Sequence, residues 1–167
     1  YRLQRGMSVE NSPIGIAILK MVNARSAGVM FTLDPLNGDR SIIFIEGSWG
    51  LGESLVSGQV TPDKFAINKV TMDITKRDIC EKAIEMIGGP EGEVIAVEVE
   101  PERRSMACLS EEEVVALGKL GKLVETKYKA PQDIEWAIDK DLPFPENIIL
   151  LQTRPETVWS KKEVKPL

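Results

Sequence analysis

Short apolar segments separated by turn residues set the strongest limit on how this chain folds. Apolar runs at residues 14–22, 27–32 and 42–45 each lead within a few residues to Asn, Asp, Gly or Pro. Runs of this length bounded by turn residues are typical of strands, and such short connections join antiparallel neighbours. The first part of the chain is therefore predicted to form an antiparallel meander.

The remaining segments complete an α+β pattern. Residues 63–70 and 94–99 alternate like strands, whereas residues 76–87 carry apolar side chains at helical spacing and are predicted as a helix. Ser110 followed three residues later by Glu113 is a capping box, which predicts a helix up to about residue 128. We expect a single domain over residues 1–167, a mainly antiparallel sheet with packed helices, and a loose charged tail after residue 159.

The last two predicted strands, residues 133–139 and 148–154, place polar side chains on one face. Alternation in the first strand separates Ile134, Trp136 and Ile138 from Asp133, Glu135 and Asp139. In the second strand, Gln152 and Arg154 share a face. If the two strands pair antiparallel, one surface carries Glu135, Gln152 and Arg154.

This trio has two interpretations from the residues alone. A carboxylate and an amide oxygen are hard ligands that suit Mg²⁺, and a guanidinium suits the phosphate oxygens that such an ion bridges. Equally, the three residues are ordinary exposed positions of an amphipathic hairpin. Both interpretations stay open at this point.

A glycine-rich stretch, Gly47-Ser48-Trp49-Gly50-Leu51-Gly52, precedes Glu53. Glycine permits positive φ and close backbone approach, so amide groups here could point at phosphate, with Glu53 as a further metal ligand. The stretch lacks the pattern of a Walker P-loop or of a dinucleotide fingerprint. A tight turn that binds nothing is the alternative.

The first apolar run, residues 14–22, is predicted as a buried strand. It could form the wall and hinge that receive an adenine, or it could simply pack in the core.

Composition excludes several classes of function. The net charge of −5 disfavours nucleic acid and anionic membranes as partners, and no apolar run approaches a membrane span. Histidine is absent, so the chain carries no phosphohistidine. Cys80 and Cys108 lack metal-site spacing, which favours reduced thiols and a cytoplasmic location.

Four phrases occur in an order that resembles a known family: KMVNARSAGVMFTLDP (20–35), GSWGLGESLVSGQVTPD (47–63), PQDIEWAI (131–138) and LLQTRPETVW (150–159). They resemble the later part of the N-terminal nucleotide-binding domain of the phosphoenolpyruvate synthase and pyruvate phosphate dikinase family. Rifampin phosphotransferases and the nucleotide-binding subunit of phenylphosphate synthase are similar. The resemblance covers nearly the whole chain and is least distinctive over residues 70–108.

The resemblance implies an ATP-grasp fold, of which this chain would be the second lobe, with ATP and Mg²⁺ as cofactors. Carried onto matching positions, Glu135 and Gln152 would bind Mg²⁺, and Arg154 would contact the phosphates and act in catalysis. Glu53 would assist metal or phosphate binding. Lys20, Met21 and Val22 would lie along the adenine hinge.

The resemblance also implies partners. A first lobe before Tyr1 and a swivelling phosphohistidine domain, in the same chain or a separate subunit, would complete an enzyme that passes phosphate from ATP to histidine and then to pyruvate. Alone, the chain is expected to be inactive, to bind ATP weakly and to self-associate through an uncovered face. The alternatives are a nucleotide-binding subunit of a split enzyme, such as phenylphosphate synthase, and a non-catalytic nucleotide-binding module.

Overall fold

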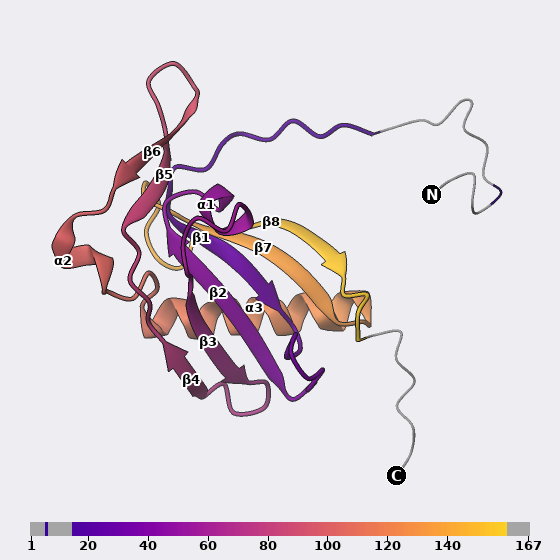
Figure 1. Ribbon diagram of the computed structural model, residues 1–167. Coiled ribbons are helices and arrows are strands. Elements are labelled where there is room, and N and C mark those ends of the chain that lie inside the picture. Colours follow the sequence, from indigo (N-terminus) through magenta and orange to yellow (C-terminus); the bar gives the residue numbers. More distant parts are fainter. Residues whose placement is uncertain (1–5, 7–14, 160–167) are drawn as a thin grey trace, which may run out of the picture.

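The computed structural model describes residue 6 and residues 15–159 as one antiparallel sheet, one long helix and a small hairpin (Figure 1). The strands are β1 (Ala24–Phe31), β2 (Ile42–Trp49), β3 (Asp63–Asn68), β4 (Ile74–Asp78), β5 (Ile84–Gly88), β6 (Val94–Glu98), β7 (Gln132–Asp139) and β8 (Ile148–Pro155). The helices are α1 (Glu53–Val56), α2 (Pro101–Arg104) and α3 (Glu111–Tyr128).

The main sheet has the order β4-β3-β2-β1-β7-β8, and all neighbouring strands are antiparallel. β1 to β4 form an antiparallel meander, in which the predicted strands 27–32 and 42–45 appear as β1 and β2 but 14–22 takes no part. The β7–β8 hairpin adds to the free side of β1. β5 and β6 form a separate two-stranded sheet. The predicted α+β class with a mainly antiparallel sheet is confirmed.

Helix α3 crosses behind the main sheet and covers one face of it (Figure 1). The core between them is built from these buried side chains: Met30, Ile43, Ile45, Phe65, Ile67, Val114, Leu117, Ile134, Trp136 and Ile138. The β-branched and aromatic members alternate along their strands, which is why one face of each strand is buried. The opposite face of the sheet is not covered by α3.

The start of α3 follows the sequence closely. The Ser110 hydroxyl accepts a hydrogen bond from the Glu113 amide, and the Glu113 carboxylate accepts one from the Ser110 amide. The capping box is therefore confirmed. Glu113 also forms an ion pair with Arg25 at 2.7 Å, so the same carboxylate ties the helix to β1.

Two predicted elements are wrong. Residues 76–87 are not a helix, because the segment contributes β4 to the edge of the main sheet and β5 to the small hairpin. The helical spacing of its apolar residues is overridden by strand pairing with β3 and β6, an effect of tertiary context that local periodicity does not contain.

The predicted buried strand at residues 14–22 is also not found. Residue 14 lies outside the described residues, and residues 15–22 form no strand or helix; Ile16 and Ile18 are 85% and 93% exposed. A strand needs a neighbour to pair its backbone, and no described segment lies beside this one in the sheet. Ile16, Ile18 and Leu19 are therefore exposed, and of residues 15–22 only Val22, at the end of the run, packs against a small buried cluster of Ala24, Ala27 and Ala137.

Two boundaries also shift. Residues 47–49 of the glycine-rich stretch belong to β2, so the loop itself is only residues 50–52. β3 ends at Asn68, two residues before the predicted end. The tail predicted to be loose begins at residue 160 and lies outside the described residues. No helix within the described ranges is long and apolar enough to cross a membrane.

Candidate functional site

The open face of the main sheet carries the polar residues that the sequence singled out. In the β7–β8 hairpin, Glu135 is the direct cross-strand partner of Gln152, and Asp133 is the partner of Arg154. Direct partners in an antiparallel pair project on the same side of the sheet. Since Ile134, Trp136 and Ile138 of β7 are buried beneath α3, these four side chains lie on the opposite face.

A β-bulge in β8 allows this arrangement. Trp136 pairs with Leu150, whereas Glu135 pairs with Gln152, so Leu151 is the extra residue. Before the bulge, Ile148 and Leu150 pack against the core; after it, Gln152 and Arg154 are exposed. The predicted hairpin is confirmed, but the bulge was not foreseen.

Arg154 is bound to a neighbouring carboxylate on this face. Its Nε donates a hydrogen bond to Asp133 Oδ2 at 2.8 Å, and this ion pair raises the pKa of Arg154. The Arg154 side chain is 66% exposed, so the pair is solvated and contributes little to stability. The guanidinium therefore keeps donors free to bind an incoming anion.

A pocket of about 300 Å³ lies beside the hairpin. Its wall is mostly apolar, with Glu53 and Glu135 as its two carboxylates. The other lining residues come from the segment before β1, from β1, the loop before α1, α1, β6, β7 and β8: Met21, Ala27, Gly28, Val29, Leu51, Gly52, Leu55, Val94, Trp136 and Leu151. We call this the carboxylate pocket. An apolar wall with a few convergent charges is typical of a small-molecule site.

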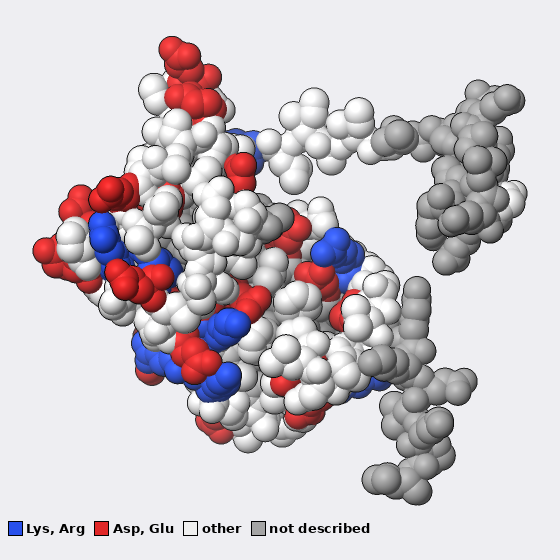
Figure 2. Space-filling model, in the orientation of Figure 1, with Lys and Arg blue, Asp and Glu red and all other residues white. Residues whose placement is uncertain are grey.

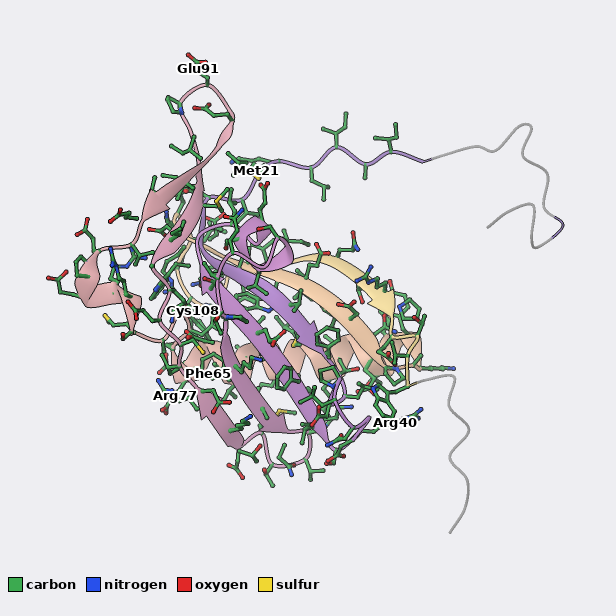
Figure 3. All side chains as sticks on the ribbon, in the orientation of Figure 1. Met21, Arg40, Phe65, Arg77, Glu91 and Cys108 are labelled. Carbon is green, nitrogen blue, oxygen red and sulfur yellow. The ribbon has the colours of Figure 1, made fainter. Side chains whose placement is uncertain are left out.

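The predicted hinge residues divide between two neighbouring pockets. Met21 lines the carboxylate pocket and also a second pocket of about 280 Å³, which Val22 lines together with Ile87 and Lys140. Figure 3 shows Met21 where the N-terminal segment meets the body of the molecule. Lys20 is exposed and lines neither pocket. Met21, Glu53 and Glu135 thus line the same pocket, whereas Lys20 does not.

The glycine-rich loop differs from the expected phosphate cradle. Gly50 has φ +73°, and its amide donates to the Arg25 carbonyl at 2.9 Å; the next amide, of Leu51, donates to the Met86 carbonyl at 2.8 Å. These two amides are therefore engaged within the protein and do not point at a ligand. Glu53 is the first residue of α1 and is exposed, which leaves its carboxylate accessible.

The structure adds residues to the site that the sequence did not assign. Asp133 was placed on the correct face but received no role. Val94 lines the carboxylate pocket from β6, and its contribution was hidden because the hairpin containing β5 was partly predicted as a helix. Glu46 and Lys64, an ion pair at 3.3 Å, continue the same face across β2 and β3. Alternation within 42–49 and 63–68 was the signal available for this last pair.

The residues present fit a magnesium ion that is held only partly by the protein. Within residues 15–159, no group of three or more Cys, Asp or Glu side chains is arranged to hold a metal. Glu135 and Gln152 offer two adjacent oxygen donors instead. Mg²⁺ commonly takes one or two protein ligands and completes its octahedron with water and substrate phosphates.

Acidic and basic side chains are interspersed on the face seen in Figure 2, with acidic groups at the tip of the β5–β6 hairpin and around α2. Figure 3 labels Glu91 at the tip of the β5–β6 hairpin and Met21 nearer the body of the molecule. The charged side chains that line the carboxylate pocket are Glu53 and Glu135.

Comparisons with known proteins show the family of the chain. The family described as "Pyruvate phosphate dikinase, AMP/ATP-binding domain" matches residues 1–167. Similar proteins include a probable phosphoenolpyruvate synthase of Staphylothermus marinus (40% identical, 99% of this chain, 22% of that protein). The phosphoenolpyruvate synthases of Aeropyrum pernix (39%, 99% and 24%) and Pyrococcus furiosus (38%, 97% and 20%) are also similar.

The chain spans about a fifth to a quarter of the length of these relatives, so further domains exist in them. The family model, in contrast, matches the whole of this chain, and these relatives are 38–40% identical to it. The chain belongs to the pyruvate phosphate dikinase AMP/ATP-binding domain family.

Proposed function

We propose that this chain supplies the Mg²⁺–ATP-binding half of a phosphotransferase of the phosphoenolpyruvate synthase type. In this proposal, phosphate passes from ATP to a histidine on another domain and then to pyruvate. The observation that carries the proposal is the register of β7 and β8, which sets Glu135 beside Gln152 and Arg154 one cross-strand pair further along the same open face.

Each of these residues has a role that its chemistry supports. Glu135 and Gln152 would hold the metal through oxygen atoms, and the ion would neutralise charge on the phosphates. Arg154 would stabilise negative charge on the group being transferred, because its fork of N–H donors matches phosphate geometry. Asp133 orients that fork in the structure, through the 2.8 Å bond to Nε.

The pockets next to the hairpin support a place for the rest of the nucleotide. The carboxylate pocket has an apolar wall that includes Met21, Leu51 and Val94, and such a wall suits the flat face of a nucleobase. Glu53 lies on the same pocket and is close enough in the fold to assist the metal or the phosphates. The absence of histidine means that the acceptor must come from another part of the protein or from a second chain.

Calorimetric titration of the full-length protein tests the proposal. Wild-type protein is expected to bind ATP with Mg²⁺ present and to bind it much more weakly in EDTA. The double variant Glu135→Gln with Gln152→Ala should remove most of this magnesium dependence. Equal ATP affinity with and without Mg²⁺, or a double variant that binds like wild type, contradicts the proposal.

A further inference from the structure

Three segments meet where β2 ends and the glycine-rich loop begins. Trp49 is the last residue of β2, and its indole Nε1 donates a hydrogen bond to the Arg103 carbonyl at 3.1 Å. The guanidinium carbon of Arg103 lies 4.6 Å from the centroid of the Trp49 ring, in a cation–π contact. α2 is thereby fixed to the end of β2 by two different interactions.

Arg103 also reaches β5. Its NH1 donates to Glu85 Oε1 at 3.2 Å, and Glu85 is only 8% exposed. The other Glu85 oxygen is buried and has no hydrogen-bond partner among the residues that the structure describes. A buried carboxylate is costly unless a cation neutralises it, and Arg103 is the cation that contacts this one.

The loop after Trp49 lies directly against the strand that carries Glu85. Gly50 forms a parallel bridge with Met86, and the Leu51 amide donates to the Met86 carbonyl. A Cβ at Gly50 would lie 2.3 Å from that same carbonyl oxygen, so the two backbones are as close as glycine allows. Figure 1 shows α1, which follows this loop, at the same end of the sheet as β5 and β6.

These contacts fix the relative positions of two parts of the wall of the carboxylate pocket. The loop and α1 supply Leu51, Gly52 and Glu53 to one part of the wall, and the β5–β6 hairpin supplies Val94 to another. The second pocket is likewise lined from both segments, by Leu51 of the loop and Ile87 of β5. The distance between loop and hairpin therefore sets the width of both pockets.

We propose that Arg103 is a positioning residue for the nucleotide site: by joining Trp49 to Glu85, it holds the glycine-rich loop against β5 and so fixes Glu53 and the pocket walls. The inference rests on the proposed function, since it concerns the same site. Arg103 itself lines neither pocket, so its effect on the site is exerted through the loop and the hairpin.

Arg104 offers a matched control. It is the next residue of α2 and carries the same charge, but it donates to the Val99 carbonyl at 2.8 Å and to Glu98 at 3.2 Å, away from the loop. Replacing it removes one guanidinium from the same short helix. A general effect of charge or of α2 stability would therefore appear equally in both arginine variants.

The experiment measures the Kd of Mg²⁺–ATP by calorimetry for the full-length protein and its Arg103→Ala, Arg103→Lys and Arg104→Ala variants. Thermal unfolding and amide hydrogen exchange of residues 50–55 are recorded on the same samples. Arg103→Ala is expected to weaken binding about tenfold and to speed exchange at Gly50 and Leu51. Arg103→Lys keeps a cation near Trp49 and should recover part of the affinity, and Arg104→Ala should match wild type.

Binding by Arg103→Ala that equals binding by Arg104→Ala overturns the inference. If Arg103→Ala does not fold, Arg103→Lys is compared with Arg104→Lys, and a loss of about threefold in the first alone is expected. Equal binding by these two lysine variants overturns the inference as well. A wild-type protein that does not bind Mg²⁺–ATP contradicts the proposed function instead, so the two failures are distinguishable.

Discussion

At the scale of single residues, Arg154 combines exposure with a defined orientation. The ion pair with Asp133 holds one edge of the guanidinium on the sheet face, while two-thirds of the side chain is exposed to solvent. Lysine in this position would carry the same charge but would lack the planar fork. Arg154 is thus suited to binding phosphate oxygens in a fixed direction.

Replacing Arg154 tests this role directly. In the full-length protein, Arg154→Ala is expected to lower kcat for ATP-dependent phosphate transfer about 100-fold, because charge developing in the transition state loses its donor. The KM for ATP should change much less. Steady-state kinetics provide the measurement.

Arg77→Ala is the control for this experiment. Arg77 lies on β4, at the opposite edge of the sheet, where it pairs with Glu111 at 2.9 Å. Loss of its charge should leave kcat unchanged. The catalytic assignment of Arg154 is wrong if both variants retain the same activity.

At the scale of elements, the register of the sheet is fixed by an aromatic ring lying on two glycines. Gly28 of β1 pairs with Trp136 on one side and with Gly47 on the other. A Cβ added at either glycine would come within 2.7 Å of the Trp136 ring, so only glycine leaves space for it. The fit holds β7 in the alignment that presents Glu135 on the open face.

Substitution of Gly28 is expected to be severe. A Cβ at this position would also lie 1.9 Å from the backbone oxygen of Glu46, which cannot move without breaking the β1–β2 pairing. Gly28→Ala should lower the free energy of unfolding by about 3 kcal/mol or more, measured by urea denaturation. Gly88→Ala, in β5, has no atom within 4 Å of its added Cβ and should change stability little. Equal stability of the two variants would show that the ring does not fix the register.

The sequence predicted elements well where local signals agreed with tertiary pairing. The capping box at Ser110, the alternation in β7 and the turn residues of the meander each specify their element directly. The helix predicted for residues 76–87 was wrong because its two halves pair with different strands, β3 and β6. Local spacing of apolar residues does not reveal such pairing. The strand predicted for residues 14–22 was wrong because an apolar run cannot indicate whether a neighbouring strand is available to pair with it.

The candidate site was predicted in part for similar reasons. Alternation placed Glu135, Gln152 and Arg154 on one face, and the resemblance supplied their roles, which remain predictions. Alternation along a strand assigns residues to a face, but it does not predict that Arg154 pairs with Asp133. The contribution of Val94 and the engagement of the Gly50 and Leu51 amides depend on how the β5–β6 hairpin docks, which no local pattern encodes.

At the scale of the whole molecule, one buried ion pair connects three distant segments. Lys82 Nζ and Asp63 Oδ1 are 2.6 Å apart, and both side chains are 0% exposed. The Asp63 carboxylate also accepts bonds from the amides of Cys80 and Cys108, at 2.9 and 2.8 Å. The start of β3 is therefore linked to the segment before β5 and to the segment before α3.

Removing one partner of this pair should unfold the molecule more easily. Lys82→Met leaves the Asp63 carboxylate buried without its cation, and we expect a loss of about 3–5 kcal/mol in the free energy of unfolding. Lys76→Met removes an exposed lysine paired with Asp78 and should cost far less. Thermal and urea unfolding of both variants provide the comparison; similar losses would mean that the buried pair does not join the segments.

The extra residue in β8 has a further consequence. Because Leu151 interrupts the alternation, the even-numbered residues of β8 face α3 before it (Ile148, Leu150) and the open face after it (Gln152, Arg154). If Leu151 were lost, β8 would alternate regularly, with Leu150 still opposite Trp136, Gln152 still opposite Glu135 and Arg154 still on the open face. The site is therefore expected to tolerate the loss of Leu151 better than the loss of Thr153, which would place Gln152 and Arg154 on opposite faces of the sheet.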